Sequence, residues 1–316
     1  METIYIKHIS EINKVDNLTL CLGFFDAFHL GHLELIKKAK EKDGKTGILS
    51  FSSNPRELLF NQDCPIINNL EMKEEILKYY NIDYFFILDL SWEILNLTKD
   101  EFINKLLVPL GVKNIVCGFD NSFGKEGKGH PKDLIDSGLF HVDVIDEVKN
   151  SFNQKISSTL IHSLIEDGKI EEANSYLFRP YQLKGKVING FHIGRTIQFP
   201  TANIFNEENF ALPKNGVYAT IIIIDDKKYH SMTNVGVHPT INQVSSPLIE
   251  TYVFDHKINI YNKNVKLIFY KRTRDEIKFD SLDELKKQLE IDEKEIKNYL
   301  INIEWETIRC YIIRAT

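Results

Sequence analysis

The chain has 316 residues, of which 43% are hydrophobic, and its formal net charge is −6 at pH 7. This length exceeds that of one typical domain, so we expect two. The modest negative charge excludes a protein that binds nucleic acid or an anionic membrane by global electrostatic attraction. The first ten residues carry no apolar signal core, and no apolar run reaches membrane-spanning length. The sequence therefore predicts a cytoplasmic protein without a membrane segment.

The four cysteines are Cys21, Cys64, Cys117 and Cys310. Three of them lie in or beside apolar runs, and none forms a C-x-x-C pair. This pattern favours buried, reduced thiols over disulfides or a zinc site.

Short apolar runs alternate with helix-period segments through the first half of the chain. Strands are expected at 18–26, 46–53, 83–90, 113–120 and 140–148, and helices between them at 32–42, 71–80, 98–110 and 130–138. Near-continuous apolar strands that alternate with helices predict an α/β fold, a doubly wound parallel sheet covered on both faces. Two short helices, 158–168 and 170–177, are expected to close this half, the first from a Ser/Thr N-cap.

The pattern changes at Arg179-Pro180, and we expect one domain over residues 1–180 and a second over 181–316. Antiparallel strands are expected at 181–188, 216–224, 229–236, 249–255 and 264–273, with a hairpin break at 225–228. One long helix is expected over 281–301, with Ser281 as its cap and Glu284 three residues on. The second half therefore predicts a small β-barrel with a long helix. Residues 304–316 show no pattern that we can assign.

The stretch GFFDAFHLGH, from Gly23 to His32, stands where the first buried run gives way to a helix. In an open parallel sheet, ligands bind beyond the carboxyl ends of the strands. Gly31 would let the backbone approach a ligand, and the helix start would offer N–H groups to an anion. His29 and His32 would donate hydrogen bonds to phosphate oxygens as charge develops. On spacing alone, a helix entry with two surface histidines explains the stretch equally well.

Two later loops have a similar character. GFDNSFGKEGKG, residues 118–129, is rich in glycine and lysine, and ISST, residues 156–159, precedes a helix. Hydroxyls and helix N–H groups suit a phosphate. Three loops that could each bind an anion, all on one sheet, favour a nucleotide-binding site over chance.

The second half contains GRTIQFPTANI, residues 194–204. Pro200 fixes φ, and Thr201 and Asn203 alternate on an extended segment, so both side chains face one point. A hydroxyl and an amide carbonyl are oxygen ligands that suit magnesium bound to phosphates. Glu250 lies on an expected strand among apolar neighbours. It is either a cross-strand salt-bridge partner, which the spacing alone favours, or a general base.

In this order, GFFDAFHLGH, GFDNSFG and ISST resemble the adenylyltransferase module of the prokaryotic bifunctional riboflavin kinase/FAD synthetase family. The segments GKVINGFHIGRTIQFPTANI, LPKNGVYAT, TNVGVHPTI, ETYVFD and RDEIKFDSLDELKKQLEID resemble its riboflavin kinase module. The resemblance covers almost all of the chain. It implies a nucleotidyltransferase domain followed by a six-stranded antiparallel barrel. It also implies phosphorylation of riboflavin to FMN and transfer of AMP from ATP to FMN, giving FAD and pyrophosphate.

The resemblance also implies roles for single residues. In the first domain, His29 and His32 would hold the ATP phosphates, and the residues that shape the loop or line the phosphate side would be Gly23, Phe25, Asp26, Gly31, Ser157, Ser158, Thr159 and His162. In the barrel, Thr201 and Asn203 would meet magnesium and ATP, Glu250 would take the hydroxyl proton, and Arg274 and Glu276 would contact flavin. The other ATP-binding residues of the barrel would be Gly185, Lys186, Gly190, Gly194, Arg195 and Pro200. The implied ligands are riboflavin, FMN, FAD, ATP, ADP and Mg²⁺, with no obligate protein partner, nucleic acid or membrane.

Several positions depart from the family pattern. Ala27 stands where glycine is usual, SSNP (52–55) replaces Asp-Pro-His-Pro, and His162 replaces the arginine that ends Ser-Ser-Thr-x-x-Arg; Gln198 and His238 are departures in the barrel. Arginine is a permanent, bidentate phosphate ligand and histidine is not; His162 either contacts phosphate or faces solvent. Three hypotheses stay open: a working bifunctional enzyme, a riboflavin kinase with a weak or inactive first domain, and a flavin-binding regulatory protein.

Overall fold

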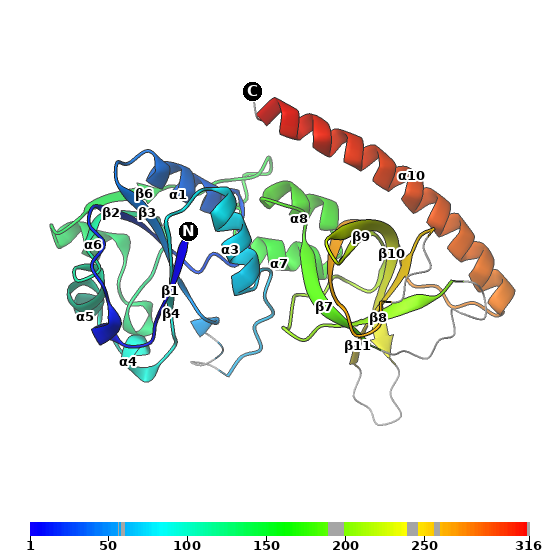
Figure 1. Cartoon of the computed structure of the whole chain (residues 1–316), viewed down its shortest axis with the longest axis horizontal. Coiled ribbons are helices and arrows are strands. Elements are labelled where there is room, and N and C mark those ends of the chain that lie inside the picture. Colours follow the sequence, from blue (N-terminus) through cyan, green and yellow to red (C-terminus); the bar gives the residue numbers. More distant parts are fainter. Residues whose placement is uncertain (56, 58–60, 189–198, 239–245, 256–259, 315–316) are drawn as a thin grey trace. The chain divides into compact units, whose positions relative to one another are not determined.

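The computed structural model describes residues 1–55, 57, 61–188, 199–238, 246–255 and 260–314. The chain divides into two compact units, Met1–Leu160 and Ile161–Thr316, each with its own sheet (Figure 1). The domain boundary that the sequence indicates after residue 180 stays a prediction.

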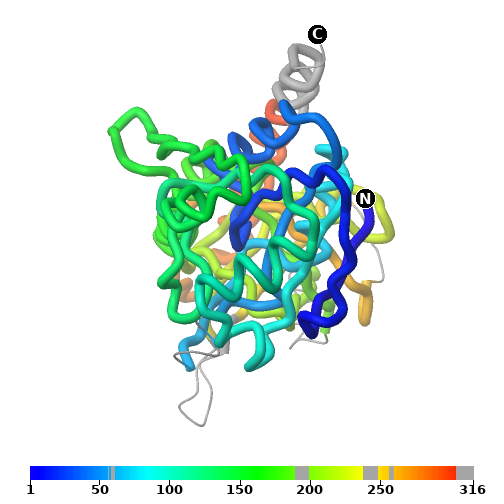
Figure 2. The backbone as a smooth tube through the Cα atoms, turned by 90° about the vertical axis from the view of Figure 1, so that its left-hand side faces the viewer, coloured from blue at the N-terminus to red at the C-terminus, as the bar shows by residue number. Residues whose placement is uncertain are grey.

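The first unit is built on a sheet of six parallel strands in the order β1-β4-β3-β2-β5-β6. The strands are β1 (Glu2–Ile6), β2 (Leu18–Leu22), β3 (Lys45–Phe51), β4 (Tyr84–Leu88), β5 (Val112–Gly118) and β6 (His141–Ile145). The sequence predicts the last five, and the parallel α/β fold is confirmed. It does not predict β1, because this short edge strand buries only Ile6 and lacks a clear apolar run. Figure 2 faces this unit, with the dark-blue start of the chain along one side.

Helices cover both faces of this sheet. On one face, Cys21 donates to the Leu35 carbonyl of α1 (Leu30–Lys40), and Thr3 donates to Glu74 of α3 (Leu70–Tyr79). The other face carries a core cluster of Leu18, Leu20 and the π-helical turn η2 (Phe102–Leu107). The remaining helical pieces are η1 (Ile9–Glu11), α4 (Trp92–Leu95), α5 (Lys99–Glu101), η3 (Lys125–Gly127) and α6 (Pro131–Asp136).

The strand order reverses direction between β2 and β5. From β2 the chain adds β3 and β4 on one side, and then crosses to place β5 and β6 on the other. In an open parallel sheet, a ligand site is expected beyond the carboxyl ends of the strands at such a reversal. The loops after β2 and β5 are the two that the sequence singles out at this edge.

The second unit is a closed antiparallel barrel of six strands in the order β10-β11-β8-β7-β12-β9. The strands are β7 (Gln182–Ile188), β8 (Thr201–Phe205), β9 (Gly216–Ile224), β10 (Lys227–His238), β11 (Ser246–Val253) and β12 (Asn264–Arg274). This confirms the predicted barrel. Of the two short helices, α7 (Ser158–Glu166) crosses from one unit into the other, and α8 (Ile170–Tyr176) packs on β12.

The barrel interior is partly polar. Four hydroxyl side chains with no solvent exposure form a chain: Thr220 contacts Ser231 at 2.8 Å and Thr233 at 2.8 Å, and Thr233 contacts Thr251 at 2.9 Å. Each of the four hydroxyls has at least one hydrogen-bond partner within the barrel, as buried polar groups require.

The long helix α10 (Leu282–Arg314) packs on the outer face of β9 and β10 (Figure 1). Its buried residues Ile296 and Leu300 join a cluster with Ala219 and Met232 of those strands. Ser281 accepts from the Glu284 N–H, as the expected cap requires. The sequence predicts an end at residue 301, whereas the helix continues through residues 302–314.

The two-residue turn between β9 and β10 holds two aspartates in a left-handed backbone conformation, which is strained for residues other than glycine. Asp225 and Asp226 both have positive φ, 48° and 63°, as a two-residue type I′ turn requires. We expect Asp226→Gly to raise the free energy of unfolding of the barrel by about 0.5–1 kcal/mol, because glycine adopts this conformation without strain. Urea unfolding measures the change, and Lys228→Gly, in the following strand, should lower it instead. An unchanged or lower midpoint for Asp226→Gly would contradict the strain argument.

Candidate active sites

The first candidate site lies where β2 runs into α1. His29 is the N-cap residue of α1, and its Nδ1 accepts from the backbone N–H of His32 at 3.4 Å. The two imidazoles stack, with ring centroids 3.8 Å apart and planes inclined by 18°. The motif therefore forms one unit at the start of the helix rather than two independent surface histidines, since His29 is 92% buried and His32 is partly buried.

Burial sets the charge of these rings. Desolvation, aided by the charge of Lys155, lowers the pKa of His29 to about 4. Desolvation, aided by His29, also holds the pKa of His32 well below its usual range. Both rings are therefore neutral at pH 7. Because Nδ1 of His29 accepts a hydrogen bond, its proton lies on Nε2, which leaves that atom as the donor. Nδ1 of His32 is buried and has no hydrogen-bond partner among the described residues.

Two aromatic residues of this loop are held in a left-handed backbone conformation. Phe25 has φ 54° and Phe28 has φ 48°, and both side chains are fully buried. Their rings pack around His32, with centroids 4.8 Å and 6.3 Å from its ring. Bulky residues avoid this conformation, so the surrounding packing must offset a cost of about 1–3 kcal/mol each. Such strain is concentrated at functional sites.

Two glycines make room for rings in this loop. A Cβ at Gly31 would lie 3.0 Å from Cε1 of His29, and one at Gly23 would lie 3.0 Å from the Phe25 ring. The space beside Gly31 is thus taken by the imidazole of His29. A ligand contact at Gly31, which the sequence indicates, stays a prediction.

Asp26 ties the loop to a neighbouring segment. Its Oδ1 accepts from the Ile67 N–H at 3.0 Å, and its carbonyl accepts from the Asn68 side chain at 2.6 Å. Asp26 is buried, and this arrangement fits a residue that shapes the loop.

Lys73 is a buried cation beneath the same loop, and the sequence analysis missed it. Its Nζ donates to the Phe24 carbonyl at 2.8 Å and lies 4.0 Å from the centre of the Phe24 ring. Desolvation lowers the pKa of Lys73 to about 8, and Asp26 opposes that shift. A signal was present: along α3, Lys73 stands three and four residues before Ile76 and Leu77, which places it on the buried face.

The other two loops that the sequence indicates, residues 118–129 and 156–159, lie beside His29 and Gly31. Lys155 donates to Asp120, which follows β5, and both charges act on His29. The carbonyl of Ile156 lies 3.9 Å from the Cβ position at Gly31. Ser157 accepts from the Leu160 N–H at 3.2 Å and so caps α7, as expected. The structure therefore brings all three loops together at the strand-order reversal.

Ser158 and Thr159 form the first turn of α7, and His162 lies one turn further along it. A helix start offers N–H groups to an anion. Roles in phosphate binding for these three residues stay predictions.

The second candidate site is a row of side chains across the outside of the barrel. In the strand register, Asn203 on β8 lies opposite Glu250 on β11, and Glu250 lies opposite Asn234 on β10. Residues directly opposite one another point to the same face of a sheet. The register thus places amides, not cations, at both cross-strand positions beside Glu250. Asn234 is a member of this row that the sequence analysis missed.

Thr201 occupies the neighbouring row, opposite Tyr252. Thr201 and Asn203 lie two residues apart on β8, so both point to the same face as Glu250. This confirms that they share a face, while their roles stay predictions. Among the described residues there is no cluster of three or more His, Cys, Asp or Glu side chains that could hold a metal ion.

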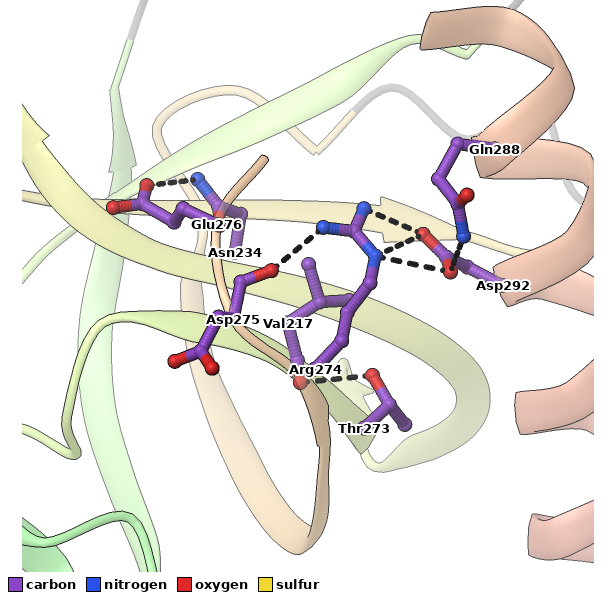
Figure 3. Close-up of polar contacts among 8 residues, drawn as sticks. All are labelled: Val217, Asn234, Thr273, Arg274, Asp275, Glu276, Gln288 and Asp292. Atoms are coloured by element: carbon purple, nitrogen blue, oxygen red, sulfur yellow. Dashed lines mark hydrogen bonds and ion pairs between the residues drawn. The ribbon is translucent and has the colours of Figure 1, made fainter. Parts of the chain in front are cut away.

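The same row continues to Val217 on β9 and Arg274 on β12. All three guanidinium nitrogens of Arg274 have protein partners, chiefly Asp292 of α10 (Figure 3). The carboxylate of Glu276 lies 3.3 Å from the side-chain nitrogens of Asn234 and Asn215. Their expected contacts with flavin stay predictions.

The remaining barrel residues are spread along β7 and β8. A Cβ at Gly185 would lie 2.4 Å from Ile204, so this glycine permits close packing of β7 on β8. Lys186 and Pro200 are exposed. Gly190, Gly194 and Arg195, and the departure Gln198, lie outside the described residues.

Comparison with known proteins agrees with this division. A family model described as FAD synthetase matches residues 11–160, and one described as riboflavin kinase matches residues 177–300. A bifunctional riboflavin kinase/FMN adenylyltransferase of Listeria monocytogenes is 36% identical over 96% of this chain and 100% of its own length. The chain belongs to this bifunctional family. A second member, from Bacillus subtilis, is 33% identical over 96% of this chain and 99% of its own length.

A solved structure shares the fold. A crystal structure described as a macrolide-efflux protein from Streptococcus pneumoniae has a TM-score of 0.87 and 33% identity, and covers 94% of this chain and 99% of its own. Within the described residues, no helix combines the length and the apolar character needed to cross a membrane.

The neutral histidines lead to a pH prediction. An unfolded histidine titrates near pH 6.5 and His29 at about 4, so the unfolded chain binds the proton first as pH falls. The free energy of unfolding of the first unit should therefore decrease by roughly 2–3 kcal/mol between pH 6.5 and 4. Denaturant unfolding across pH measures the loss, and NMR signals of the imidazoles, assigned with His29→Gln, give the pKa. A pKa of His29 near 6.5 would contradict its burial.

Proposed function

We propose that this chain phosphorylates riboflavin to FMN in its barrel and transfers AMP from ATP to FMN in its first unit, giving FAD and pyrophosphate. The observation that supports this most strongly is the strand register, which sets Glu250 directly between Asn203 and Asn234. Family membership supports both activities, because its members are named for them. A cytoplasmic setting fits Cys21 and Cys117, which are buried and carry reduced thiols.

In the barrel, the ribityl 5′-hydroxyl oxygen would attack the γ-phosphorus of ATP, and ADP would leave. Glu250 would orient that hydroxyl and accept its proton. Thr201 and Asn203 would face the phosphates, and their oxygens suit magnesium, which would neutralise phosphate charge when bound. Two neutral oxygens are a weak protein site, so they fit a cation that arrives with the nucleotide and keeps phosphate and water ligands.

In the first unit, a phosphate oxygen of FMN would attack the α-phosphorus of ATP, and pyrophosphate would leave. His29 would donate from Nε2 to a phosphate oxygen, and the start of α7, with Ser158 and Thr159, would offer further donors. Neutral imidazoles do this as hydrogen-bond donors rather than as cations. The loop is pre-formed by Asp26, so little reorganisation is needed as charge develops.

One incubation tests both activities. The protein is given riboflavin, ATP and magnesium, and FMN and FAD are resolved by chromatography. Both products support the proposal. FMN alone would indicate a kinase whose first unit has lost AMP transfer, as the replacement of arginine by His162 allows, and neither product would indicate a flavin-binding protein.

We expect Glu250→Gln to reduce FMN formation by about 10²–10⁴-fold and to spare AMP transfer to supplied FMN, because the amide cannot accept the proton. The two rates are measured separately, with Glu207→Gln, an exposed residue beyond β8, as the matched control. Near-normal kinase turnover would remove Glu250 from the mechanism, and a loss of thermal stability alone would support a structural ion pair.

We expect His29→Ala and His32→Ala each to reduce FAD formation by about 10²-fold or more and to leave FMN formation intact. The reason is that the two sites lie in separate compact units. His141→Ala, an exposed histidine on β6, is the control. Loss of kinase activity in folded His29→Ala protein would contradict the assignment of the two activities to two sites.

A further inference from the structure

The ion pair between Arg274 of β12 and Asp292 of α10 is buried and tightly made. Nε of Arg274 lies 3.1 and 3.0 Å from the two carboxylate oxygens, and Nη2 lies 2.7 Å from one of them (Figure 3). Asp292 is 3% exposed, and Gln288 donates to it at 2.9 Å. Both carboxylate oxygens therefore have donors: Oδ1 accepts from Arg274 and Gln288, and Oδ2 accepts from Arg274.

Asp292 stands where an apolar residue would be expected. Along α10, Leu285, Leu289, Ile296 and Leu300 all pack on the barrel, and Asp292 lies in the middle of this stripe. Burying a carboxylate is costly, and an apolar residue of similar size is often as stabilising as a buried ion pair. Stability alone therefore does not explain an acid at this position.

A series of contacts connects this ion pair to the row formed by Asn203, Glu250 and Asn234. Nη1 of Arg274 donates to the Asp275 carbonyl at 2.9 Å, which fixes the backbone as it leaves β12. The next residue is Glu276, whose Oε1 lies 3.3 Å from the Asn234 amide nitrogen. A Cβ at Gly236 would lie 2.4 Å from that same oxygen, so the glycine leaves the space that the carboxylate occupies. Asn234 in turn lies directly opposite Glu250.

We propose that Asp292 is a positioning residue for the kinase site. It holds Arg274, and Arg274 holds the turn that sets Glu276 beside Asn234 and Glu250. This inference rests on the proposed riboflavin kinase activity of the barrel. Asp292 touches neither substrate nor reacting atoms, and it acts through Arg274 and the turn that Arg274 holds.

The test is a double-mutant cycle between two residues that belong to different ends of this chain of contacts. Asp292→Asn, Glu276→Gln and the double variant are made in the full chain, and kcat and KM for riboflavin are measured for FMN formation. We expect each single variant to raise KM by roughly tenfold with a smaller change in kcat, since a slight misplacement weakens binding. If Asp292 acts through Glu276, the double variant should resemble the worse single variant.

The controls separate positioning from stability. Glu293→Gln removes the neighbouring ion pair of α10, to Lys297 at 2.8 Å, and should leave KM for riboflavin unchanged. Effects on KM that multiply to about a hundredfold in the double variant would overturn the proposal. So would an Asp292→Asn variant that melts at lower temperature with an unchanged KM.

A milder variant keeps the test available if Asp292→Asn does not fold. Gln288→Ala removes one donor to Asp292 and keeps the ion pair, and it should raise KM by a few-fold, again without adding to Glu276→Gln. Additive effects here would also overturn the proposal. Failure of the wild-type chain to form FMN would instead refute the proposed function, which keeps the two outcomes distinct.

Discussion

Strand register is the constraint on which both candidate sites depend. Backbone hydrogen bonds between neighbouring strands determine which side chains stand side by side, and a slip of one residue would turn every side chain to the other face. In the barrel this register sets Asn203, Glu250 and Asn234 in one row. In the parallel sheet, β2 lies between β3 and β5, and the loops that leave β2 and β5 therefore reach the same edge. Neither candidate site contains an unusual type of residue, because in both units the sheet brings ordinary side chains together.

Each unit also buries a charge close to its site. In the first unit, Lys73 donates to the Phe24 carbonyl, beneath the loop that carries His29. In the barrel, Asp292 binds Arg274, which lies in the row that includes Glu250. A charge inside a protein is costly unless it is well partnered, so it strongly favours the one arrangement that satisfies it. The loop between β2 and α1 needs such support, because Phe25 and Phe28 hold it in a strained backbone conformation.

The sequence predicts the fold class, the barrel and most elements, because buried strands and amphipathic helices leave clear periodic patterns. It predicts the residue types at both sites, and the structure adds how they are placed. What it missed are residues whose chemistry contradicts their surroundings: Lys73 and Asp292 both look like solvent-facing charges, although helical spacing puts each on a packed face. Asn234 was missed because its place beside Glu250 is a property of pairing between strands, which a single sequence does not display.

The place of β1 has a consequence for synthesis of the chain. Among the strands that the structure describes, Glu2–Ile6 comes first in the chain, yet it is an edge strand and its partner is β4, Tyr84–Leu88. Since a chain emerges from the ribosome in order, this segment must wait unpaired until those later residues appear, whereas β2 and β3 pair soon after they are made. A nascent chain stalled before Tyr84 would therefore expose its first strand. The sequence of β1 is short and half polar, which is why its periodicity does not predict a strand. Such a sequence also limits pairing of the exposed strand with other chains during that interval.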